Sequence, residues 1–136
     1  MAATSQPISI GPYRVRGLRD RDFRLDGGSM FGVVPRVLWE KLEPPDPKDH
    51  TVSLATRPIL IEGAACGPIL VEPGIGGRWE AKPKAIYRIA DAPTVEGSLR
   101  EAGLAAGDVR VVVLTHFHWD HAGAAVTKDR SGAAIP

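Results

Sequence analysis

The sequence predicts an α/β fold, and three observations support this. Short apolar runs typical of strands alternate along the chain with segments whose apolar residues recur at helical spacing. The two clearest strand runs are joined by a turn of small residues, which favours a hairpin. A third run, at residues 109–114, ends directly at a cluster of histidines. A length of 136 residues fits one domain with the sheet and helices packed together.

The N-terminal third is predicted to contain short strands and one helix. Residues 1–12 show no clear pattern, and we expect a flexible tail there. Apolar and charged residues alternate over residues 13–25, which predicts two short half-exposed strands or one hairpin. Within them, the charged run at residues 19–22 is expected to be a solvated strand edge or turn. Residues 26–29 predict a loop, and residues 35–42 predict a helix with proline in its first turn.

The middle of the chain is predicted to form the central hairpin. Residues 58–62 and 68–72 are nearly continuous apolar runs, which predicts burial on both faces. Cys66 lies in the turn between them and has no basic neighbour to lower its pKa, so we interpret it as a small turn residue. A single cysteine forms no intrachain disulfide, which favours a reducing compartment.

The following segment is predicted to add two helices and a buried strand. Residues 81–89 favour a helix despite Pro83. Thr94 is typical of a helix N-cap, and Gly103 is typical of a C-terminal stop. Residues 109–114 are interpreted as a buried central strand.

Composition and charge argue against several classes of function. The net charge is +1 and the basic residues are scattered, whereas nucleic-acid binding needs a clustered basic face. No apolar stretch is long enough to span a bilayer, and the N-terminus lacks a signal-peptide pattern. We therefore expect a cytoplasmic protein that binds neither nucleic acid nor membrane.

The histidine cluster has the spacing of a metal site. His116 and His118 are two residues apart, so in an extended segment both rings point to one side and chelate one metal. Asp120 and His121 are displaced by the turn that follows and face a neighbouring position. Imidazole and carboxylate ligands suit Zn²⁺ and also Fe or Mn. The fourth histidine, His50, lies in a polar loop and is interpreted as a surface residue.

Residues 115–123, Thr-His-Phe-His-Trp-Asp-His-Ala-Gly, resemble the HxHxDH motif of the metallo-β-lactamase superfamily. Residues 69–76 resemble the strand and turn that precede this motif, with Glu72 and Pro73 in place of the usual Asp and Thr. Residues 26–32 and 34–39 resemble the N-terminal segment of a subgroup that includes quorum-quenching lactonases and organophosphate-hydrolysing relatives.

The resemblance implies the N-terminal half of an αββα sandwich, with a mixed sheet and helices on its outer face. It also implies two divalent metal ions, with Zn²⁺ as first choice. His116 and His118 would bind the first metal, while Asp120 and His121 would bind the second. Asp120 would also act in catalysis by orienting the nucleophilic hydroxide. The remaining ligands would come from a complementary C-terminal half, either a separate chain or a cleaved continuation.

The function implied is a metal-dependent hydrolase that attacks a lactone or another ester-like bond of a small molecule through a metal-bridging hydroxide. His118 favours hydrolysis, because related di-iron redox enzymes commonly carry Glu at that place. Two alternatives stay open: a non-enzymatic half-domain or interaction subunit, and a metal oxidoreductase of the sulfur dioxygenase type. Trp119 is interpreted either as a wall of the substrate entrance or as a packing residue. Met30 and Phe31 are interpreted either as lining an apolar pocket or as filling the core. Trp39 and Trp79 are expected to be packing residues.

Overall fold

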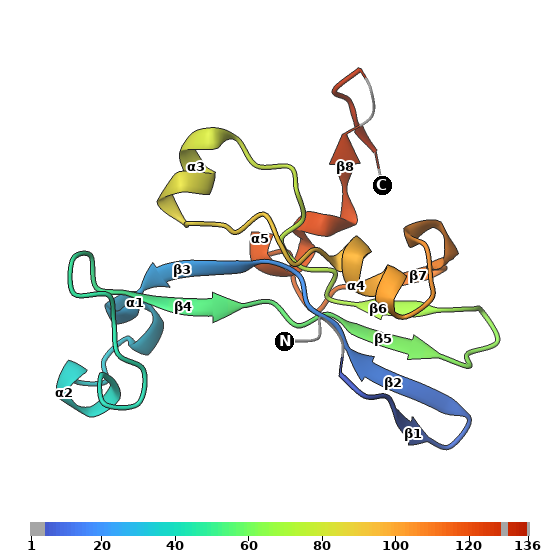
Figure 1. The fold of residues 1–136 in the computed structure, drawn as a ribbon, viewed down its shortest axis with the longest axis horizontal. Coiled ribbons are helices and arrows are strands. Elements are labelled where there is room, and N and C mark those ends of the chain that lie inside the picture. The colour runs from blue at the N-terminus through green and yellow to red at the C-terminus, as the bar shows by residue number, and fades with distance from the viewer. Residues whose placement is uncertain (1–4, 129–130, 136) are drawn as a thin grey trace.

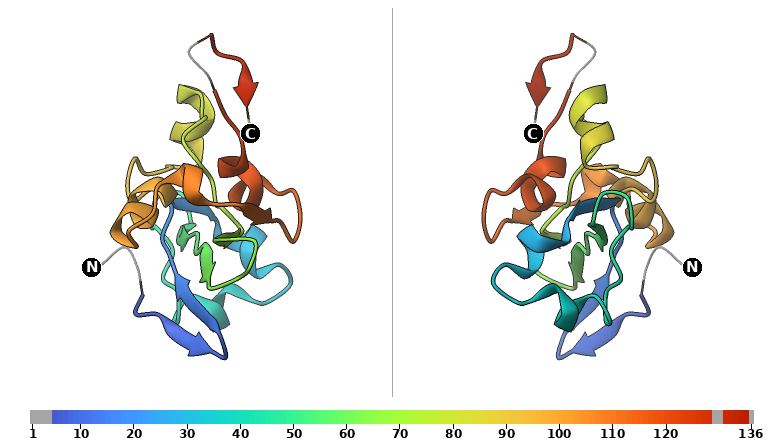
Figure 2. Two further views of the ribbon diagram at one scale, coloured as in Figure 1. Left: turned by 90° about the vertical axis from the view of Figure 1, so that its right-hand side faces the viewer. Right: turned by 90° about the vertical axis from the view of Figure 1, so that its left-hand side faces the viewer.

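The computed structural model describes residues 5–128 and 131–135 and is built on a mixed five-stranded sheet (Figure 1). The strands follow the order β1-β2-β5-β6-β7, in which only β6 and β7 are parallel neighbours. A separate hairpin forms an arm, and a short strand pair lies at the opposite end of the molecule from β1 (Figure 2). The strands of the five-stranded sheet are β1 (Ile8–Ile10), β2 (Tyr13–Gly17), β5 (Ile59–Glu62), β6 (Ile69–Val71) and β7 (Val111–Val113). The arm is β3 (Asp22–Asp26) with β4 (Thr51–Ala55), and the short pair is β8 (Thr127–Lys128) with β9 (Ala134–Ile135).

The helices are short, and α4 packs on the five-stranded sheet while α1 and α2 lie at the tip of the arm (Figure 1). This mixed sheet with helices confirms the α/β prediction. None of the helices in the described ranges is long and apolar enough to cross a membrane. Their bounds are α1 (Gly27–Phe31), α2 (Arg36–Trp39), α3 (Ala81–Ile86), α4 (Val95–Glu101) and α5 (Trp119–Ala122), with 3₁₀ turns at Ala106–Asp108 and Gly123–Ala125.

One face of the sheet forms the main core with α4. The buried residues of this core come from the β2–β3 junction, β5, β6 and α4, namely Leu18, Leu60, Leu70, Val95 and Leu99. As predicted, Thr94 is the N-cap of α4, and its Oγ1 accepts a hydrogen bond from the Gly97 amide at 3.0 Å. The chain leaves the helix at Gly103, where φ is +85°, and the amide of Leu104 donates to the Leu99 carbonyl at 2.9 Å.

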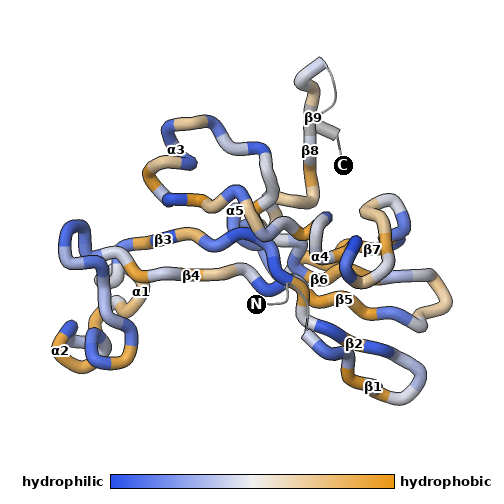
Figure 3. The backbone as a smooth tube through the Cα atoms, in the orientation of Figure 1, coloured by the Kyte–Doolittle hydropathy of each residue, from blue (hydrophilic) through white to orange (hydrophobic). Residues whose placement is uncertain are grey.

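The opposite face of the sheet is apolar but only partly covered by the described residues. Its side chains follow the register in two rows, Ile59–Val71–Val113 and Ile61–Ile69–Val111. Ile59 is 41% exposed and Val113 is 42% exposed. Hydrophobic residues are concentrated along β5 and β6 (Figure 3). Below, this surface is called the open face.

The open face corrects two predictions. Within the described residues β7 is one of the two edge strands of its sheet, so the run at residues 109–114 is not a central strand. The runs at 58–62 and 68–72 are buried on the α4 side only. An apolar run shows that both faces suit burial, but it does not show which segment covers each face.

The N-terminal region also differs from its prediction. Residues 8–10 form β1, an edge strand paired with β2, rather than part of a flexible tail. The loop at residues 26–29 is largely helical, because the Asp26 side chain accepts a hydrogen bond from the Ser29 amide at 2.8 Å and caps α1. Strand β4 has no counterpart among the predicted elements. Helices α2 and α3 are shorter than the segments predicted at residues 35–42 and 81–89.

Candidate metal centre

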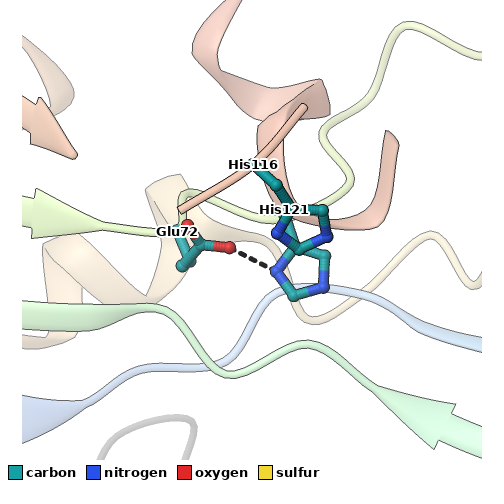
Figure 4. Close-up of side chains that lie close together, drawn as sticks. All are labelled: Glu72, His116 and His121. Carbon is teal, nitrogen blue, oxygen red and sulfur yellow. Dashed lines mark hydrogen bonds and ion pairs between the residues drawn. The ribbon is translucent and has the colours of Figure 1, made fainter. Parts of the chain in front are cut away.

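The parallel pairing of β6 and β7 brings the predicted site together. Val71 pairs with Val113, so the residues that follow the two strands emerge at the same edge of the sheet. Glu72 follows β6, and its amide donates to the Val113 carbonyl at 2.9 Å. The histidine motif follows β7. Figure 4 shows Glu72, His116 and His121 meeting at this edge.

The three histidines of the motif form one cluster. The ring centroids of His116 and His118 are 4.5 Å apart, as the two-residue spacing predicts. Helix α5 starts directly after His118 and turns the chain back, with the His121 amide bonded to the His118 carbonyl at 3.0 Å. This turn places the His121 ring 4.1 Å from the His116 ring.

Glu72 connects the two strand ends through a single carboxylate. One oxygen accepts a hydrogen bond from the Thr115 amide, and the other bonds to Nδ1 of His121. When Nδ1–H donates to Glu72, the lone pair of His121 lies on Nε2, which is the arrangement of a carboxylate that orients a metal-binding histidine. Burial raises the pKa of Glu72, but the bonds from Thr115 and His121 outweigh it, so the pKa lies below its usual value.

The donor set fits a divalent metal. Nε2 of His121 lies 3.5 Å from Oδ2 of Asp120. Two ligand atoms bound tetrahedrally at about 2.1 Å from one Zn²⁺ ion are separated by about 3.4 Å. Potential ligand atoms of Glu72, His116 and His121 also lie within 4.8 Å of one another, whereas His118 and Asp120, two of the four predicted ligands, fall outside this group in the described part of the chain. Because one Glu72 oxygen bonds to Nδ1 of His121, as a carboxylate that orients a metal-binding histidine does, we assign Glu72 to orienting His121.

A cleft of about 600 Å³ opens beside the cluster. One wall carries His118, Asp120 and His121, and the other is the apolar inner side of the β3–β4 arm. The lining also includes Thr56, Arg57 and Glu72. Met30 lines this cleft, whereas Phe31 stacks on Trp39 at a centroid distance of 4.6 Å. The apolar and aromatic side chains of the lining are Phe23, Leu25, Met30, Leu54, Ala55, Tyr87 and Trp119.

Trp119 fits both of its predicted interpretations, as a packing residue and as a wall of the substrate entrance. Its ring contacts three aromatic rings, those of Phe23, Trp79 and Tyr87, at centroid distances of 5.1, 5.0 and 5.0 Å. The same ring lines the cleft. Trp119 therefore packs against the arm and walls the site. His50 is exposed near α2, where its Nδ1 lies 3.1 Å from the Arg36 guanidinium, so it stays outside the cluster as predicted.

Glu72 was not among the predicted ligands, although its place at the end of a strand, directly before a turn, could have pointed to it.

We expect Glu72→Gln to weaken metal binding by Asp120 and His121 by about 10–100-fold. The amide would place a donor against Nδ1 of His121 and favour the tautomer with hydrogen on Nε2. Chelator competition in the full-length protein measures the affinity.

A control for this variant is Glu62→Gln. Glu62 ends the neighbouring strand β5 and pairs with Arg16 at 3.0 Å, away from the cluster. It should leave metal affinity unchanged. Equal metal affinities of the Glu72→Gln and unsubstituted proteins would contradict the assignment of Glu72 as the group that orients His121.

Comparison with known proteins agrees with this geometry. The family model for the metallo-beta-lactamase superfamily matches residues 58–127, just over half of the chain. A probable metal-dependent hydrolase from Staphylococcus aureus is 30% identical, with a TM-score of 0.80 over 89% of this chain and 43% of that one. Comparison with curated proteins gives no match.

Two further solved structures share the fold. AidC, a dizinc quorum-quenching lactonase solved with a product, is 22% identical, with a TM-score of 0.63 over 96% of this chain and 42% of that one. AbOPH, a hydrolase of the beta-lactamase superfamily, is 17% identical, with a TM-score of 0.69 over 94% of this chain and 40% of that one. The chain thus spans less than half the length of each of the three structures.

Proposed function

Because this chain belongs to the metallo-β-lactamase superfamily, we propose that it is the metal-binding part of a hydrolase that cleaves a lactone or another ester-like bond of a small molecule. The observation that carries the proposal is the convergence of His116, His118 and His121 beside an apolar cleft, with Asp120 next to His121. A cluster of ligating groups in a largely apolar cleft is the usual form of a small-molecule metalloenzyme site.

In this proposal the four motif residues divide between two metals. His116 and His118 hold one ion, and Asp120 and His121 hold the other, with Zn²⁺ as first choice and Fe or Mn as alternatives. The two ions, when bound, supply water activation near neutral pH and polarise the substrate carbonyl. Asp120 orients the attacking water through its carboxylate, and Glu72 holds His121 in the tautomer that leaves Nε2 available.

The substrate class is supported by the cleft and by the relatives. The apolar wall from the β3–β4 arm suits an apolar organic group beside the scissile bond, and Arg57 also lines the cleft. One structural relative is a lactonase and another is a probable metal-dependent hydrolase. The histidine at position 118 favours hydrolysis over redox chemistry.

We further propose that a complementary C-terminal half, as a continuation or as a separate chain, completes the site. Each proposed metal has two ligands from the motif, whereas a catalytic zinc ordinarily has three protein ligands. The open face, with Ile59 and Val113 both more than 40% exposed, would be covered by a second sheet. The solved relatives are more than twice as long as the part that this chain matches.

A panel of substrates tests the proposed function. Lactones, phosphotriesters, β-lactams and glutathione thioesters are assayed with the full-length protein, before and after treatment with a chelator. We expect lactone or ester hydrolysis that disappears with the metal. Hydrolysis that survives complete metal removal would contradict the mechanism. Oxygen consumption with a persulfide, without ester hydrolysis, would instead identify a sulfur dioxygenase.

A further inference from the structure

Asp20, at the junction between β2 and β3, is a fully buried carboxylate held by backbone amides. It is 0% exposed, although it lies in a run of charged residues predicted to be solvated. Its Oδ2 accepts hydrogen bonds from Ile75 at 2.7 Å and Gly76 at 3.1 Å. Its Oδ1 accepts one from Val95, the first residue of α4, at 3.0 Å. Three such bonds offset the cost of burying the carboxylate, and they tie two separate segments, the loop at residues 75–76 and the start of α4, to one side chain.

The loop that Asp20 holds is in direct backbone contact with helix α5. The Gly74 amide donates to the His121 carbonyl at 3.1 Å, and the Ala124 amide donates to the Gly74 carbonyl at 2.9 Å. The loop and α5 are so closely packed that a side chain would not fit between them, because a Cβ on Gly123 would lie 2.3 Å from the Ile75 oxygen. A Cβ on Gly74 would lie 2.6 Å from Oδ2 of Asp20. A continuous series of contacts therefore runs from Asp20, through the loop at residues 74–76, to α5.

We propose that Asp20 is a positioning residue for the metal held by Asp120 and His121. Asp20 touches neither ligand; it fixes the loop whose amide binds the His121 carbonyl, and so it fixes where α5 presents both side chains. His116 and His118 precede α5 and emerge from β7, so their metal depends less on this contact. The inference rests on the proposed function, since it requires two metals.

The test is Asp20→Asn in the full-length, metal-loaded protein. The amide keeps the size of the side chain but turns an NH₂ group toward at least one backbone N–H that now donates to it. We expect the affinity for the second metal to fall by about 10–100-fold, as for other groups that support ligands indirectly. The affinity for the first metal should change much less. Chelator competition measures both steps, and the absorption spectrum of the Co²⁺-substituted protein should change with the second equivalent of metal.

Ser98→Ala is the matched control. Ser98 is also buried, and its hydroxyl bonds to the amide of Arg19 at 3.2 Å and the carbonyl of Arg19 at 2.6 Å. These bonds hold the same strand junction rather than the loop at residues 74–76. Ser98→Ala should lower the unfolding midpoint and keep both metal affinities. Asp20→Asn with an unchanged second affinity, or the same loss of affinity in both variants, would overturn the inference.

A second measurement uses the unsubstituted protein, so it tests the inference even if the Asp20→Asn protein does not fold. If the loop and the second metal are coupled, filling that site must stabilise the loop in return. Hydrogen exchange at the amides of Ile75, Gly76 and Val95 should slow when the second equivalent of metal binds, while the Arg19 amide should not respond. Unchanged exchange at all four amides would overturn the inference. A full-length protein that binds no metal would contradict the proposed function as well.

Discussion

Asp120→Ala is expected to lower kcat/KM for the hydrolysed substrate by on the order of 10³-fold, about 4 kcal/mol of transition-state stabilisation. In the proposed site, the substitution would remove a ligand of the second metal and also the carboxylate that orients the attacking water. Asp120 lies in the cleft with Oδ2 3.5 Å from Nε2 of His121, and it is the only carboxylate of the motif. Steady-state kinetics, with metal content measured on the same samples, gives the result.

The control is Glu101→Ala, which removes an exposed carboxylate at the end of α4, outside the cleft. Its kcat/KM should equal that of the unsubstituted protein. An Asp120→Ala protein that keeps more than about a tenth of the activity, a loss of less than about 1.4 kcal/mol, would contradict the catalytic assignment.

Trp119→Ala is expected to lower the free energy of unfolding by about 3 kcal/mol, as for other large-to-small substitutions at packed aromatic residues. The ring has three aromatic neighbours, and each such pair adds stabilisation beyond the area that it buries. Activity should fall less than in Asp120→Ala, because Trp119 shapes the cleft without binding metal. Urea denaturation of the metal-free protein measures the stability.

Phe117→Ala gives a matched comparison within the same motif. Phe117 lies between two histidines but is 86% exposed, so its loss should change stability by no more than about 0.5 kcal/mol. Equal destabilisation by the two substitutions would show that the aromatic cluster around Trp119 does not hold the arm to the site.

Local patterns in the sequence predicted the parts of the structure that depend on neighbouring residues. The N-cap at Thr94 and the stop at Gly103 define α4 through contacts within a few positions. The same holds for His116 and His118, whose spacing alone predicts that their rings lie together. The α/β class follows from the alternation of strand and helix patterns, and the structure confirms it.

Contacts between distant positions were not predictable in the same way. Asp20 is separated by 55 positions from Ile75, and in the sequence it is one of four consecutive charged residues that resemble a solvated turn. Glu72 is separated by 49 positions from His121, and only the parallel pairing of β6 and β7 brings them together. The exposure of β7 could not be predicted either. Its hydrophobic residues indicate that the strand suits burial, but they do not show whether any segment covers it.

Metal reconstitution of the full-length protein tests the proposed site directly. In that site His116, His118, Asp120 and His121 would hold two metals on which hydrolysis depends. Protein stripped by a chelator is titrated with Zn²⁺ while bound metal and hydrolysis of the best lactone or ester substrate are measured together. We expect no hydrolysis by the stripped protein and a full return of activity at two equivalents per chain. Undiminished hydrolysis by the stripped protein, or reconstitution unaffected by alanine at His116 and His121, would contradict the proposed site.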